Sequence, residues 1–167
     1  GDAARVPRSL ARKGQVTWPP DSRRLAYVSE REEAQHLFLY DFGTGTETQL
    51  TRDAKNDDAP RFSPDGNLLA FVRDDKELHV LELASKQERV LAKGFISASP
   101  RSLAWSADSK WVAYLGLSTR SFRNAYIVPA AGGESRAVSA IPNANTGTLS
   151  WSPDGTVLVL NTSQRTA

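Results

Sequence analysis

The chain has 167 residues, 40% of them hydrophobic and 24% charged, and its formal net charge is +2. This composition is typical of one folded domain and excludes an intrinsically disordered chain, while the absence of cysteine excludes disulfides and thiolate metal sites. The small excess of Lys and Arg is scattered and forms no continuous stripe with interleaved aromatics, so we expect no nucleic-acid partner.

The first predicted elements are short β-strands. Residues 8–14 (RSLARKG) are similar to residues 88–94 (ERVLAKG) and are expected to form an outer strand. A strand ending in Trp18 follows, and then a turn that holds Asp21. Three further strands are expected, at 25–28, at 37–40 and in a segment that ends at 49–51. β-Branched and aromatic residues fill these segments, and Gly, Pro, Asp and Ser mark their ends.

This series recurs along the chain. The aromatic residue that ends the first strand returns at spacings of 44, 43 and 46 residues, and the turn aspartate returns at the same spacings. The aromatics are Trp18, Phe62, Trp105 and Trp151, and the aspartates are Asp21, Asp65, Asp108 and Asp154. No segment keeps a period of 3.6 residues, so helices are not expected.

Four short strands in such a period make one blade of a β-propeller. We therefore predict an all-β fold, an incomplete propeller of four-stranded antiparallel blades. The predicted division is the last strand of a preceding blade at 5–14, blades at 15–52, 58–94 and 101–140, and half a blade at 147–163. Both end blades would leave an apolar face open. We therefore expect self-association, or completion of the ring by the remainder of the parent chain or by a second copy.

The repeated turn has a physical explanation. In residues 63–66 (SPDG), Pro fits the second position of a type I turn, and the Asp carboxylate accepts hydrogen bonds from nearby backbone N–H groups. Ser22 and Ser109 replace the Gly, at a cost of roughly 1 kcal/mol if this position needs a positive φ. The preceding aromatic is expected to point away from solvent and to pack against the next blade.

The turn at 62–66 (FSPDG) and the strand at 69–72 (LAFV) resemble the TolB-type, WD-like propeller repeat, as does the stretch 125–134. The resemblance covers residues 5–162, departs from the repeat only in turns, and is closest to the N-terminal propeller of tricorn-type proteases. For tricorn-type proteins it implies a propeller for substrate access beside a separate serine-protease part. For TolB-like proteins it implies protein binding in the bacterial envelope.

No catalytic, metal or cofactor site is predicted. A G-x-S-x-G elbow is absent, and the two histidines are interpreted as a packing residue (His79) and a surface-loop residue (His36). The pairs Asp57–Asp58 and Asp74–Asp75 are interpreted as parts of a link between blades and of a hairpin turn, because they lack the spacing of a calcium loop.

Two segments that break the repeat are the predicted binding loops, since loops on a rigid scaffold often bind partners. They are residues 118–124 and 141–147. The candidate binding residues are Arg120, Phe122, Arg123, Asn143 and Asn145. Arg and Phe are common contact residues of interfaces.

The sequence thus favours a non-catalytic propeller segment that binds protein or peptide, as the substrate-access propeller of a tricorn-like serine peptidase. A stand-alone TolB-like periplasmic scaffold is one alternative, and part of a propeller glycosidase or lyase is another. No apolar run approaches the ~20 residues of a membrane helix, so membrane insertion is not expected. The first five residues lack Met and lead into no signal peptide, so we expect a piece of a longer bacterial protein, periplasmic or cytoplasmic.

Overall fold

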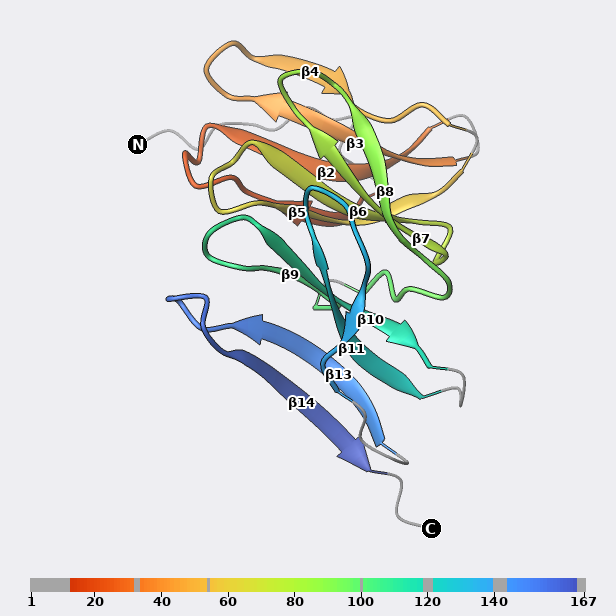
Figure 1. Cartoon of the computed structure of the whole chain (residues 1–167). Coiled ribbons are helices and arrows are strands. Elements are labelled where there is room, and N and C mark those ends of the chain that lie inside the picture. The colour runs from red at the N-terminus through yellow and green to blue at the C-terminus, as the bar shows by residue number, and fades with distance from the viewer. Residues whose placement is uncertain are drawn as a thin grey trace.

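The computed structural model describes residues 13–31, 34–53, 55–99, 101–118, 122–139 and 144–164. Regular structure in these residues consists of β-strands arranged in four antiparallel sheets, which succeed one another from the N-terminal to the C-terminal end (Figure 1). The predicted all-β, incomplete propeller is confirmed. No helix able to span a membrane occurs in the described ranges.

Each sheet is a meander in which consecutive strands pair as hairpins. The first sheet contains β1 (Lys13–Thr17), β2 (Arg24–Arg31), β3 (Ala34–Asp41) and β4 (Thr46–Gln49). The second contains β5 (Asp57–Phe62), β6 (Leu68–Arg73), β7 (Glu77–Glu82) and β8 (Glu88–Lys93). The third contains β9 (Leu103–Trp105), β10 (Trp111–Leu117), β11 (Arg123–Pro129) and β12 (Arg136–Ala137). The last contains β13 (Ala144–Trp151) and β14 (Leu158–Gln164). We number blades 1 to 4 after these sheets.

The core lies between successive blades, because both faces of each inner sheet are apolar. In β6, Leu69 and Phe71 pack toward blade 1, while Ala70 and Val72 pack toward blade 3. A third cluster joins blades 3 and 4 through Leu115 and other apolar residues. Successive residues of a strand face opposite sides of the sheet. A strand in a blade that is stacked between two others therefore needs apolar residues at successive positions.

The repeated aromatic contacts the preceding blade and not the next one, contrary to the prediction. Trp105 Nε1 donates a hydrogen bond to the Arg61 carbonyl at 3.0 Å, and Trp151 Nε1 donates to the Ala104 carbonyl at 3.3 Å. Trp18 is 51% exposed, so its predicted burial is wrong. No described sheet lies before blade 1, and the Trp18 ring instead stacks on Phe42 at 5.4 Å.

The last position of the repeated turn has a positive φ, whether Gly or Ser occupies it. This φ is 53° at Ser22 and 60° at Ser109, beside 73° and 71° at Gly66 and Gly155. The turn aspartate accepts hydrogen bonds on both sides, for example from Ser106 Oγ at 2.6 Å and from the Lys110 N–H at 3.1 Å to Asp108. These hydrogen bonds hold the pKa of Asp108 below its ordinary value. The aspartates therefore cap turns.

Candidate functional site

All four blades begin at the same end of the propeller, which we call the loop face. It carries the links that enter β5, β9 and β13 and the hairpins β2–β3, β6–β7 and β10–β11, the last on the right in Figure 1. The opposite end, the turn face, carries the repeated aspartate turns, including β9–β10 and β13–β14 on the left. Because turns of the turn face repeat from blade to blade and the loops do not, the loop face is the candidate binding surface.

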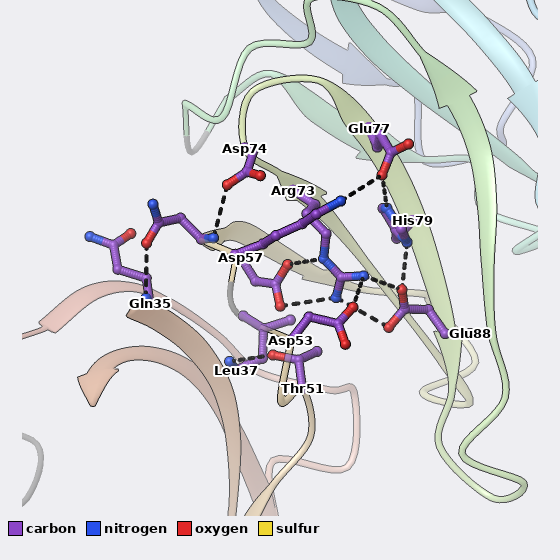
Figure 2. A network of polar contacts seen from close by, with 12 residues as sticks. Gln35, Leu37, Thr51, Asp53, Asp57, Arg73, Asp74, Glu77, His79 and Glu88 are labelled. Carbon is purple, nitrogen blue, oxygen red and sulfur yellow. Dashed lines mark hydrogen bonds and ion pairs between the residues drawn. The ribbon is translucent and has the colours of Figure 1, made fainter. Parts of the chain in front are cut away.

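A polar cleft of about 470 Å³ opens on the loop face. Hydrogen bonds tie its walls together across two blades: the Gln35 N–H donates to Asn56 Oδ1 at 3.0 Å, and the Asn56 N–H donates to Asp74 Oδ1 at 3.0 Å (Figure 2). The lining residues are Gln35, Asn56, Asp58, Val72, Asp74, Asp75, Lys76 and Ala98. The cleft is therefore built from blade 1, blade 2 and the link to blade 3.

Carboxylates dominate this cleft. Asp74 and Asp75 form the β6–β7 turn, both with positive φ (52° and 54°), which agrees with the predicted hairpin position. Burial raises the pKa of Asp58, and the charge of Asp75 adds to the effect, although the Ala59 N–H opposes it. The cleft thus favours cationic or hydrogen-bond-donating groups. Among the described residues, no group of three His, Asp or Glu is arranged to hold a metal ion.

A buried ionic network stands behind the cleft, at the seam between blades 1 and 2 (Figure 2). Arg73 is bidentate to Asp57, with Nε–Oδ1 at 2.7 Å and Nη2–Oδ2 at 3.1 Å, and it also contacts Glu88 at 2.6 Å and Asp53 at 2.9 Å. Burial alone would lower the pKa of Arg73, but the hydrogen bonds and charges of Asp57 and Glu88 outweigh it and raise that pKa. Asp57 was expected in the loop that joins two blades; instead it begins β5, and its full burial is possible because Arg73 neutralises its charge.

Both histidines are buried in strands. His79 stacks on Phe71 at 5.2 Å, which fits its predicted packing role. Its Nε2 lies 3.2 Å from Glu77, and its Nδ1 lies 2.6 Å from Glu88 without the alignment of a hydrogen bond. His36 was predicted in a surface loop; this is wrong, because β3 begins at Ala34 and buries it opposite Ser29. Neither histidine is hydrogen-bonded to a serine hydroxyl within the ranges described above.

The structure brings the two predicted binding loops together, but Arg123 and Asn145 lie in the strands β11 and β13 and not in loops, because the strands extend further than the sequence predicts. Asn145 at the start of β13 accepts a hydrogen bond from the Arg123 N–H at 2.9 Å, and Phe122 precedes Arg123 at the loop face. Arg120 and Asn143 lie outside the described residues. That these residues contact a ligand stays a prediction.

The sequence reasoning missed a strong separation of charge. Residues 30–88 contain 14 Asp and Glu and seven Lys and Arg, whereas residues 89–153 contain two and seven. The excess of Lys and Arg was interpreted as scattered, but the charges are in fact unevenly distributed in this chain of net charge +2. Counting charge blade by blade would have found this signal.

Comparison with known proteins agrees with the fold. Residues 11–167 match the family model described as PD40, TolB beta propeller domain. TolB from Acinetobacter baumannii superposes with a TM-score of 0.70 at 22% identity, covering 89% of this chain and 37% of that chain. The tricorn protease superposes with a TM-score of 0.73 at 17% identity, covering 91% of this chain and 17% of that chain. At these identities the likeness shows the fold alone.

Two curated proteins are similar in sequence. The "Uncharacterized peptidase YuxL" of Bacillus subtilis (strain 168) is 26% identical over 145 residues, which is 86% of this chain and 21% of that protein. The "Uncharacterized protein Atu1656" of Agrobacterium fabrum is 33% identical over 54 residues, which is 32% of this chain and 18% of that protein. The chain thus spans about a fifth of the length of the curated relatives it matches.

Proposed function

Since this chain belongs to the family of TolB β-propeller domains, we propose that it is a non-catalytic propeller segment that binds protein or peptide through its loop face. The observation that carries the proposal is the polar cleft, which opens where the non-repeating loops of blades 1, 2 and 3 meet. The buried ionic network of Arg73 lies behind this cleft. A preorganised binding surface reduces the conformational entropy that is lost when a flexible peptide binds.

We further propose that the propeller controls substrate access in a tricorn-like serine peptidase. Support comes from the 26% identity to a protein described as a peptidase and from the TM-score of 0.73 with the tricorn protease. The second candidate is a TolB-like scaffold, which the superposition on TolB supports. A peptidase domain elsewhere in the natural protein favours the first role; a signal peptide with no catalytic domain favours the second.

Hydrogen exchange tests the binding face. The natural full-length protein is incubated with and without a pool of casein-derived peptides, and exchange is followed by mass spectrometry. We expect slower exchange at residues 56–58, where β5 begins, and in the hairpin 74–76, since both segments hold residues that line the cleft; we expect no change in the turn 63–66. Slower exchange confined to the turn face, or none anywhere, contradicts the proposal.

A further inference from the structure

An exposed row of side chains crosses blade 3 at the loop face. The bridge between Ile96 and Gly116 and the hydrogen bond from the Leu117 N–H to the Phe95 carbonyl (3.1 Å) place Phe95 opposite Leu117. Leu117 in turn pairs with Arg123 across β10 and β11. Residues opposite one another on neighbouring strands project to the same side. Phe95, Leu117 and Arg123 therefore form one row, which we call the Phe95 patch.

The apolar part of the patch is unusually accessible. Phe95 is 50% exposed and Leu117 is 39% exposed, whereas their neighbours Ile96 and Leu115 are buried in the clusters between blades. Phe95 and Leu117 thus lie just beyond the core. Burial of two adjacent large apolar side chains is a common source of binding energy at protein interfaces.

The charge beside these apolar groups is positive and unneutralised. Arg123 forms no ion pair within the described part of the chain. Its backbone is fixed by the hydrogen bond that its N–H donates to Asn145 Oδ1. From residue 89 to residue 153 the sequence has seven cations and two carboxylates, and one of those carboxylates, Asp108, lies on the turn face.

We propose that the Phe95 patch docks a protein or peptide segment in which a large apolar side chain is flanked by carboxylates. The apolar side chain covers Phe95 and Leu117, and a carboxylate pairs with the Arg123 guanidinium, whose planar fork suits bidentate contact. This inference rests on the proposed binding role and names the chemistry of the partner.

The rest of the loop face favours this occupant over a nucleic acid. The carboxylates of Asp58, Asp74 and Asp75 line the cleft on blade 2, so a polyphosphate that extended from the patch onto blade 2 would be repelled. A short segment with an acidic part over blade 3 and a basic part over blade 2 meets complementary charge on both.

The test measures binding of a defined probe to the natural full-length protein. The probe is a fluorescein-labelled peptide, blocked at both ends, in which one Phe is flanked by Glu residues. Matched probes replace Glu by Gln, Glu by Lys, or Phe by Ala. We expect the Gln and Ala probes to bind about tenfold more weakly, and the affinity of the Glu probe to fall as salt is raised.

Variants of the protein assign the binding to the patch. Arg123→Gln and Leu117→Ser should each weaken the Glu probe about tenfold, and Arg123→Lys should weaken it less because the charge remains. Arg89→Gln and Val90→Ser are the matched controls, since both lie on β8 outside the patch and should leave binding unchanged. Circular dichroism and the melting temperature verify that each variant is folded.

The outcomes separate this inference from the proposed function. Equal affinity for the Glu and Gln probes, no binding of the Glu probe, or competition by a single-stranded oligonucleotide overturns the inference. Binding of the Glu probe that is unchanged by Arg123→Gln and Leu117→Ser also overturns the inference. If hydrogen exchange nevertheless shows casein peptides bound at the cleft, the proposed function stands. Selective weakening by the patch variants supports the inference.

Discussion

The ion pair of Arg73 and Asp57 is the most deeply buried charge in the described part of the molecule. Arg73 is 4% exposed and Asp57 is 0% exposed, and the Arg73 guanidinium donates two hydrogen bonds to the Asp57 carboxylate. Removing one charge from such a pair leaves the other buried and uncompensated, which costs more than the pair contributes when both are present.

We therefore expect Asp57→Asn to lower the free energy of unfolding by about 3 kcal/mol. The matched control is Asp53→Asn, because Asp53 contacts the same guanidinium at 2.9 Å but is 65% exposed, and its loss should cost less than about 1 kcal/mol. Urea denaturation measures both. Equal losses in the two variants would contradict the assignment of Asp57 as the main partner of Arg73.

Asp58 and Glu77 should respond to pH with opposite signs. Burial raises the pKa of Asp58, so its ionised form destabilises the fold at pH 7, and this penalty disappears as the pH falls through the raised value. Asp58→Asn should therefore stabilise the protein at pH 7 and lose that gain in acid. For Glu77 the pKa is lowered, mainly by the hydrogen bond from Lys93 and next by the contact with His79.

For Glu77 the stabilisation is present above its ordinary pKa and is lost as the pH falls through the lowered value. Glu77→Gln should thus destabilise at pH 7 and become neutral in acid. Melting temperatures of both variants and the natural protein, measured from neutral to acid pH, give the comparison. Curves that run parallel to that of the natural protein would refute the two assignments.

At the scale of the element, the repeated turn makes a prediction that distinguishes two serines. Ser22→Gly should stabilise by about 1 kcal/mol, because Gly accepts the positive φ of 53° without strain and no hydrogen bond of the Ser22 hydroxyl is lost in the described structure. Ser109→Gly should gain little, because the Ser109 hydroxyl accepts a hydrogen bond from the Asp65 N–H at 3.1 Å across the seam. Thermal unfolding of both variants tests this; an equal gain would show that the hydroxyl at 109 contributes nothing.

The strands themselves were predictable from the sequence because their apolar positions recur with the turns. The exceptions have physical causes. The polar residues Gln35 and His36 hide the beginning of β3, which is set by pairing with β2 as far as Arg31. Asp57 resembles a loop residue because the charge that allows its burial, on Arg73, comes 16 residues later. Long-range pairing of this kind is not visible in one sequence.

The candidate site was predictable only in part, because it depends on which loops share an end of the propeller. The repeat placed the loops 118–124 and 141–147 outside the regular pattern, and the bond between Arg123 and Asn145 shows that they meet. The cleft was missed, since its walls come from four separate segments whose polar residues resemble those of ordinary hairpins and links. The Phe95 patch was missed because exposure cannot be read from an apolar residue next to a strand.

At the scale of the molecule, the two end blades differ from the inner ones. Large apolar side chains are exposed on blade 1 (Val16 and Trp18) and on blade 4 (Val157 and Val159). The corresponding aromatic of each inner blade is buried instead: Phe62 is 8% exposed and Trp105 is 9% exposed. The end faces therefore present apolar area for which no described sheet supplies a neighbour.

Residues 1–167 prepared by themselves should self-associate through these faces. Replacing Trp18 and Val159 by Glu should shift the chain toward the monomer, because each substitution places a charge where an apolar contact would form. Light scattering over a range of concentrations measures the mass, and circular dichroism verifies that the chain retains its β-structure. As a control, Val90→Glu alters an exposed valine on β8, away from both end faces, and should leave the mass unchanged. A folded monomer that persists at high concentration would mean that the end faces do not attract one another, and the ring would then need further blades to close it.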